Sequence, residues 1–130
     1  MPEIPASHRD LLDQPVASLA TNGTDGHPQV TAIWFLVEDD DTIRISLNET
    51  RQKVRNLRSD AHCTFFAIDP ANPYRTLEVR ADASIEPDTD RAFVDRIGAK
   101  YDADMTKMDG PGEARVVVTL TPTKVNAWGD

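Results

Sequence analysis

The amino-acid sequence predicts a mainly β (α+β) fold, a small antiparallel barrel with six to seven strands and about three peripheral helices. Apolar and polar residues alternate over several short segments, which is the period of β-strands. Turn-forming residues join most of these segments, which favours hairpins. Strands and helices do not alternate regularly, so a doubly wound parallel sheet is not expected. The length of 130 residues is that of one domain, and we treat residues 1–130 as a single domain.

The first part of the chain predicts a short helix and two strands. Residues 5–13 are expected to form the helix, and residues 16–21 the first strand. Glycine-containing turns over residues 22–26 then favour a hairpin into a long strand at residues 29–37. This second strand is apolar on both faces. We therefore expect the barrel interior to cover one face and a ligand or a second chain to cover the other.

The middle of the chain predicts two strands with a basic helix between them. Residues 42–47 alternate regularly, and residues 63–68 form an apolar run. Between them, Thr50 is a suitable N-cap for a helix that ends near Arg58. Residues 69–74 contain two prolines and are expected to form a loop.

The last part of the chain predicts a long strand, a helix and two closing strands. Residues 76–85 show the cleanest alternation in the sequence. An acidic first turn favours a helix over residues 88–101, because carboxylates interact well with the start of a helix. The closing strands are expected at residues 115–120 and 124–128, on either side of Pro122.

The charge distribution excludes some classes of function and singles out one segment. The formal net charge is −8, so the chain is a poor candidate for coating a nucleic acid or an anionic membrane surface. No run is apolar enough for a signal peptide or a membrane span, and the expected location is the cytoplasm. Residues 51–58 (RQKVRNLR) are the exception in this acidic chain, because they contain four basic residues and no acidic one.

The cysteine and histidine residues do not indicate a metal site or a nucleophile. Cys63 is the single cysteine and lies in an apolar run, so we expect a buried, unreactive thiol. His8, His27 and His62 have no metal-ligand spacing. We expect no metal, and we assign no catalytic side chain.

The basic segment begins where a strand ends and a helix is expected to start. The start of a helix offers free backbone N–H groups and a positive dipole end, which together favour an anion. Arg51 and Lys53 add full charges there, so a phosphorylated small molecule is the natural ligand. Ideal helix geometry separates these two side chains by about 200°, and they can meet only at the first turn. The alternative is a solvated basic helix face with acidic partners.

Two sequence blocks match the pattern of a known family. The first block has Gly26, Pro28, Trp34 and Phe35. The second block has Arg51, Lys53, Arg55, Asn56, Leu57 and Asp60. Together they resemble the split β-barrel flavin and deazaflavin family, often labelled pyridoxamine 5′-phosphate oxidase-like. The closer resemblance is to the branch that binds coenzyme F420, a deazaflavin common in actinobacteria.

The resemblance covers nearly the whole chain, with two departures. Residues 75–83 are similar to a family strand, but Ala81 stands at the usual position of a glycine. Ala61 stands where the family usually has a proline. Residues 125–129 are similar to the last strand of the family.

The resemblance implies a split β-barrel of the FMN-binding type. It also implies a homodimer with cofactor sites at the subunit interface. The residues implied along the deazaflavin ring are Gln29, Val30, Thr31 and Ala32. The residues implied at the phosphate and the glutamate tail are Ser46, Thr50, Arg51 and Lys53. Arg75, which begins the family strand over residues 75–83, completes the implied cofactor-binding set.

The implied activity is that of a reductase that transfers a hydride from reduced F420 to a small organic acceptor. The cofactor supplies the hydride, while the protein orients and shields it. Solvent, Tyr74 and Tyr101 are the candidate proton donors. Three alternatives stay open. They are an FMN-dependent oxidase or reductase of the same fold, a binding or carrier protein without turnover, and a haem-binding relative that uses one of the three histidines.

Overall fold

Seven antiparallel strands form one curved sheet in the computed structural model, which describes residues 1–130. The strands are β1 (Ala17–Asn22), β2 (Pro28–Ile33), β3 (Leu36–Val37), β4 (Ile43–Asn48), β5 (His62–Asp69), β6 (Asn72–Pro87) and β7 (Arg115–Trp128). The α-helices are α1 (Gln52–Ser59) and α2 (Ala92–Tyr101). The 3-10 segments are η1 (Ala6–Asp13), η2 (Thr89–Arg91) and η3 (Met105–Lys107).

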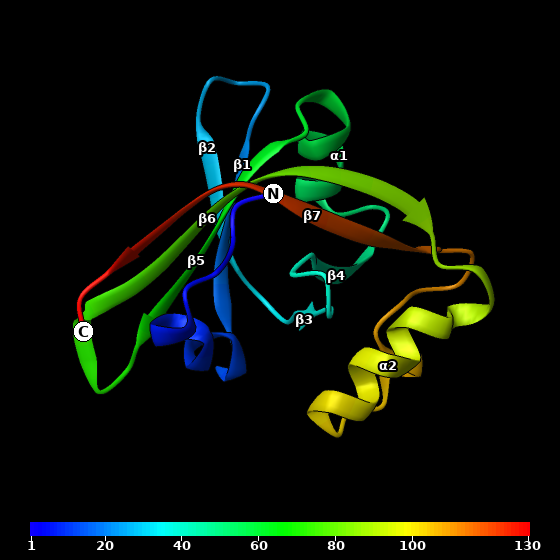
Figure 1. Ribbon diagram of the computed structural model, residues 1–130. Coiled ribbons are helices and arrows are strands. Elements are labelled where there is room, and N and C mark those ends of the chain that lie inside the picture. Colours follow the sequence, from blue (N-terminus) through cyan, green and yellow to red (C-terminus); the bar gives the residue numbers. More distant parts are fainter.

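The strand order is β2-β1-β5-β6-β7-β4-β3. Strands β2 and β3 are therefore neighbours in the sequence but lie at the two edges of the sheet. The short link between them brings the two edges toward each other, and the sheet curls into an open half-barrel (Figure 1). This arrangement confirms the predicted split β-barrel with antiparallel strands and peripheral helices.

The core lies on the concave side of the sheet, where every second residue of each strand points inward. Phe35 and Phe65 are fully buried there and pack edge to face, with ring centroids 5.0 Å apart. Val54 of α1 and Leu11 of η1 add apolar side chains to the same cluster. Figure 1 shows α1 at one end of the half-barrel and η1 towards the other.

The strand predicted at residues 29–37 is interrupted at Trp34 and Phe35. The Phe35 backbone N–H donates to the Tyr101 hydroxyl at 3.1 Å, and its carbonyl accepts from the Lys100 ammonium group. The Trp34 ring stacks on the Tyr101 ring, with centroids 4.2 Å apart and planes 3° apart. Side chains of α2 thus form hydrogen bonds with the backbone groups that would otherwise pair with a neighbouring strand. The prediction of one continuous strand over residues 29–37 is therefore wrong.

Two other strands are longer than predicted. Strand β7 runs through Pro122 without ending, because the pairing with β6 shifts register at this point and leaves Thr123 as an extra residue. A bulge of this kind is one of the few places where a sheet accepts proline. Strand β6 already begins at Asn72, so the loop predicted at residues 69–74 is a short turn.

The first two predicted helices are present with altered geometry or boundaries. The helix predicted at residues 5–13 forms as the 3-10 segment η1. The N-cap of α1 is Arg51, not Thr50 as predicted. The Thr50 backbone N–H and hydroxyl both donate to Asn48 Oδ1, at 2.9 and 2.7 Å. These bonds hold Thr50 in the preceding turn and move the start of the helix along the chain.

The helix predicted to start at Asp88 starts instead at Ala92. The two residues before it both have a φ of 58°, which interrupts the helix. The Asp88 carboxylate accepts from the backbone N–H groups of Phe93 and Val94 at 2.9 and 2.8 Å, so this acidic residue does serve the start of α2. None of the helices has the length and apolar composition that a lipid bilayer would require for a crossing.

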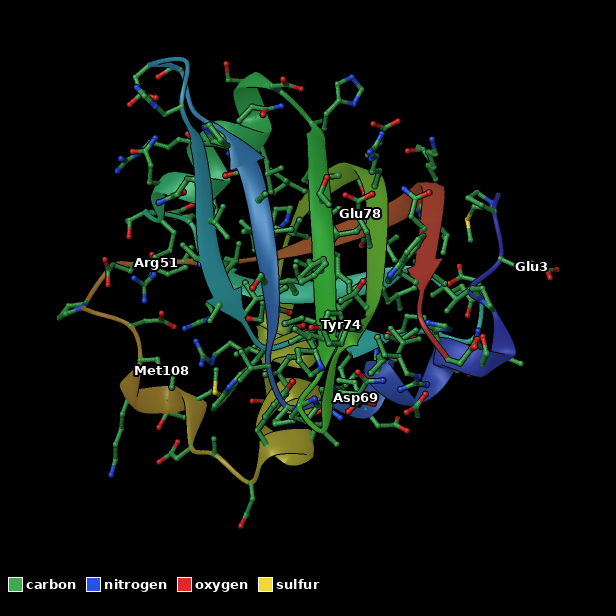
Figure 2. All side chains as sticks on the ribbon, turned by 90° about the vertical axis from the view of Figure 1, so that its left-hand side faces the viewer. Glu3, Arg51, Asp69, Tyr74, Glu78 and Met108 are labelled. Atoms are coloured by element: carbon green, nitrogen blue, oxygen red, sulfur yellow. The ribbon has the colours of Figure 1, made fainter.

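The convex face of the sheet exposes large apolar side chains. Val30 of β2, Tyr74 of β6 and Trp128 of β7 are 64%, 78% and 73% exposed, and Phe66 and Ile68 of β5 lie between these strands. Figure 2 looks onto these strands. Apolar side chains gathered on one face in this way are typical of an interaction surface.

Candidate functional site

A cavity of about 330 Å³ lies between the end of β2, strand β4, the start of α1 and the segment of α2 and η3. Its apolar wall is formed by Trp34, Ile97, Met105 and Met108. Its polar wall is formed by Ser46, Asn48, Arg51, Lys53 and Arg115. Figure 2 shows Arg51 and Met108 on the same side of the molecule, beyond the edge strand β2.

Strand alternation places the polar side chains of β4 in this cavity. Ile45 and Leu47 are buried toward the core, so Ser46 and Asn48 project from the opposite face of the strand. Asn48 pairs directly with Arg115 on the neighbouring strand β7. The adjacent strands β4 and β7 therefore supply three side chains of the polar wall, Ser46, Asn48 and Arg115.

Arg51 and Lys53 meet at the cavity because Arg51 is the N-cap residue and lies outside the regular helix. The ideal helical separation of the two side chains does not apply there. Lys53 Nζ donates to Thr31 Oγ1 at 3.0 Å. Burial and the nearby charge of Arg51 both lower the pKa of Lys53. Neither cation has a carboxylate oxygen within 4.0 Å, so their positive charge is available to an anion.

Asn56 joins α1 to the strands beside the cavity. Its side-chain amide donates to Thr21 Oγ1 at 3.1 Å and to Gln29 Oε1 at 3.2 Å. Its carbonyl oxygen accepts from Gln52 Nε2 at 2.9 Å. These bonds satisfy a buried amide, and they set the position of α1, and with it Arg51 and Lys53, against β1 and β2.

Sequence reasoning missed the buried ion pair of Arg115 and Asp109. Asp109 accepts from Arg115 Nε at 2.9 Å, from Asn48 Nδ2 at 2.8 Å and from Arg91 Nη1 at 3.3 Å. Burial opposes the ionisation of Asp109, but the hydrogen bonds from Arg115 and Asn48 outweigh it and lower the pKa. No local pattern in the sequence links these residues, since Asn48 and Asp109 are 61 positions apart.

Most of the cofactor-binding residues implied by the resemblance come together at one place. Ala32, Ser46, Arg51 and Lys53 line the cavity. Thr50 lies beside it and lines an adjoining hollow that also contains Arg51.

Three of the remaining implied residues lie around this group, and one lies apart. Thr31 contacts Lys53, Gln29 contacts Asn56, and Val30 faces outward on β2. Arg75 is not brought to the cavity within this chain. Its guanidinium is nearly buried and donates to Asp10, Asp69 and the Ser7 carbonyl, which ties β6 to η1.

The other reactive side chains do not line the cavity. Burial raises the pKa of the Cys63 thiol to about 12, and the thiol group donates to the Ala81 carbonyl, which confirms the prediction of a buried cysteine. His8 bonds Ser7 and the Trp128 carbonyl, while His62 pairs with Asp82 at the surface.

Neither candidate tyrosine lines the cavity of its own chain. The Tyr101 hydroxyl accepts from the Phe35 N–H and donates to the Phe35 carbonyl at 3.3 Å, so both of its hydrogen-bonding roles are filled. Tyr74 lies on the exposed convex face of the sheet.

Comparison with known families assigns the chain. The sequence profile of the pyridoxamine 5′-phosphate oxidase family matches residues 4–129, which is almost the entire sequence. The chain belongs to this family.

Solved structures agree with this family and its fold. A structure named F420 reductase is 36% identical to this chain and superposes on it with a TM-score of 0.82. The alignment covers 95% of this chain and 98% of the F420 reductase chain. A conserved hypothetical protein from Mycobacterium tuberculosis is 24% identical, with 98% and 86% coverage and a TM-score of 0.75. A protein from Clostridium acetobutylicum related to a general stress protein is 18% identical, with 94% and 85% coverage and a TM-score of 0.69. A comparison with curated proteins finds no match.

Proposed function

We propose that this protein is a coenzyme F420-dependent reductase that transfers a hydride from the reduced cofactor to a small organic acceptor. The convergence of Arg51 and Lys53, two cations without carboxylate partners, on a cavity at the start of α1 carries this proposal. Membership of the pyridoxamine 5′-phosphate oxidase family fits a flavin-type oxidoreductase. The 36% identity to a structure named F420 reductase favours the deazaflavin over FMN.

The residues at the start of α1 fit a phosphate group. Arg51 and Lys53 supply positive charge, and the first turn of the helix supplies free backbone N–H groups. Ser46 adds a hydroxyl donor beside them. The Thr50 hydroxyl donates to Asn48 Oδ1 and would exchange this bond for one to the ligand. In our proposal these four side chains hold the phosphate and the acidic tail of the cofactor.

The edge of β2 fits a planar ring with polar atoms at its rim. Strand β2 pairs only with β1, so every second backbone N–H and carbonyl over residues 29–32 points away from the sheet and can bond a ligand. When bound, the deazaflavin supplies a hydride at its ring carbon. Trp34 and Met105 would exclude water from the ring, and solvent is the proposed source of any proton, because the hydrogen-bonding roles of Tyr101 are already filled.

We also propose that two chains form a homodimer through the convex face of the sheet. The cavity within one chain, about 330 Å³, is at the lower end of the range for ligand pockets, about 300–1,000 Å³, so we expect a cofactor with a ring, a phosphate and a tail to extend beyond it. Ala32 lines the cavity and also lies on the strand that exposes Val30. A second chain on this face would cover the exposed apolar residues and could close the site.

An FMN-dependent enzyme is the main alternative, since FMN also has a phosphate for Arg51 and Lys53. A binding or carrier protein is the second alternative. Haem binding has less support, because no histidine lines the cavity.

Oxidation of reduced F420 under anaerobic conditions tests the proposal. We expect the protein to accelerate return of the oxidised cofactor's absorbance when activated alkenes, imines and nitro compounds are offered as acceptors. Tight binding of F420 without acceleration by any of these acceptors would favour a carrier. A protein that is purified with bound FMN and ignores F420 would contradict the proposed cofactor.

A further inference from the structure

Arg115 is the cavity residue whose chemistry the proposed cofactor site does not use. Its side chain is only 8% exposed, whereas Arg51 lies at the surface of the cavity. Arg115 Nε donates to Asp109, and Nη1 donates to Ser46 Oγ at a long 3.3 Å. A guanidinium has more N–H donors than these two bonds use. No acceptor in the protein is within hydrogen-bond distance of its remaining N–H groups, and Arg115 lines the cavity.

The surroundings of Arg115 leave positive charge uncompensated. Asp109 is its single carboxylate partner, and Asp109 is shared with Arg91. Two guanidinium groups therefore share one carboxylate. The N–H groups of Arg115 that lack an acceptor are not fully buried, so a ligand in the cavity can reach them. A ligand carboxylate would satisfy both the charge and the planar geometry of an arginine.

The cavity that contains the charged Arg115 also has an apolar wall, which is formed by Trp34, Ile97 and Met105. From this combination we infer that Arg115 binds a carboxylate of the hydride acceptor, so that the substrates are small unsaturated acids with an apolar body. This inference rests on the proposed function, in which Arg51 and Lys53 hold the cofactor. Asp109 holds Arg115 through its bond to Nε and does not itself line the cavity.

A pair of neutral and charged probes tests the inference. Cinnamate and cinnamamide have nearly the same shape, and only cinnamate is an anion. Both are titrated by calorimetry into protein already saturated with F420, so that cofactor binding is measured first and separately. We expect the wild-type protein to bind cinnamate about tenfold or more tightly than cinnamamide, as for a charge-assisted hydrogen bond.

Variants separate a ligand-binding role from a structural one. Arg115→Met and Arg115→Gln should bind both probes equally, while Arg115→Lys should retain part of the preference. Asp109→Asn should keep the preference, because the guanidinium remains. The control is Arg58→Met, at an exposed position in the last turn of α1, and it should match the wild type.

Several results would overturn the inference while leaving the proposed function intact. They are equal binding of the two probes by the wild type, no binding of either probe, and an unchanged preference in Arg115→Gln. If Asp109→Asn loses the preference for cinnamate as fully as Arg115→Gln does, Arg115 acts only through its ion pair with Asp109. Weaker F420 binding in Arg115→Gln with the probe preference intact would assign Arg115 to the cofactor. Failure of the wild type to bind F420 would instead contradict the proposed function.

Discussion

Lys53 Nζ donates a hydrogen bond to Thr31 Oγ1 at 3.0 Å and so connects helix α1 to the edge strand β2. The two elements are the ones proposed to hold the phosphate and the ring of the cofactor. The bond fixes the direction of a partly buried ammonium group that has no carboxylate partner. It orients the cation toward the cavity before any ligand arrives, which lowers the entropy cost of binding.

Replacement of Lys53 tests the phosphate assignment. Lys53→Ala should weaken F420 binding by about 1–3 kcal/mol, the range for loss of a charge-assisted hydrogen bond. The measurement is a fluorescence titration of the cofactor at low salt, with Arg58→Ala as the matched control. An affinity equal to that of the wild type would remove Lys53 from the phosphate site.

Replacement of Tyr101 separates structure from catalysis. Tyr101→Phe keeps the ring that stacks on Trp34 but leaves the Phe35 backbone N–H without its acceptor. We expect the free energy of unfolding to fall by about 1–3 kcal/mol, measured by urea denaturation. The rate of hydride transfer should not change. A large loss of rate in a stable variant would instead make Tyr101 the proton donor.

The buried carboxylate of Asp109 predicts a pH effect on stability. Because its pKa is lowered in the folded protein, its contribution is full above the unfolded pKa of about 3.9 and is lost as the pH falls through the folded pKa. Asp109→Asn should reduce the free energy of unfolding at neutral pH by about 1.5–3 kcal/mol.

The same variant should also show a shallower loss of stability than the wild type as the pH falls below about 4. Denaturation at several pH values measures this difference. Asp13→Asn, at an exposed position, should behave like the wild type. If the curves of unfolding free energy against pH are parallel for the wild type and Asp109→Asn, the hydrogen bonds of Asp109 do not lower its pKa in the folded state.

The proposed dimer predicts a monomeric variant. Phe66 lies on the convex face opposite Glu78 of β6, and Phe66→Asp would replace an apolar side chain of the proposed interface with a second carboxylate beside Glu78. Analytical ultracentrifugation should show a dimer for the wild type and a monomer for the variant. Ala99→Asp, which adds the same charge on the exposed side of α2, should remain a dimer. A monomeric wild type would exclude this interface.

The alternation of apolar residues predicted the main features of the fold. Residues 42–47 and 76–85 became β4 and part of β6 because their patterns have one buried face each. The link at Trp34 and Phe35 could not be predicted, because both residues are good strand formers. What interrupts the strand is a set of bonds from α2, some 65 residues away.

Part of the candidate site could be predicted because its residues lie close together in the sequence. Arg51 and Lys53 lie in one local block, and their charges are anomalous in an acidic chain. Arg115 and Asp109 have no such local signal, and only the pairing of β4 with β7 brings them to Asn48. Contacts between distant segments therefore determine the part of the site that the sequence did not indicate.

An equilibrium titration of the wild-type protein with F420, FMN and haem tests the central claim most directly. We predict that F420 binds in a saturable manner with a change in its fluorescence, and more tightly than FMN or haem. Tighter binding of FMN or haem, or no binding of F420 at low salt, would contradict the assignment of this cavity to a deazaflavin.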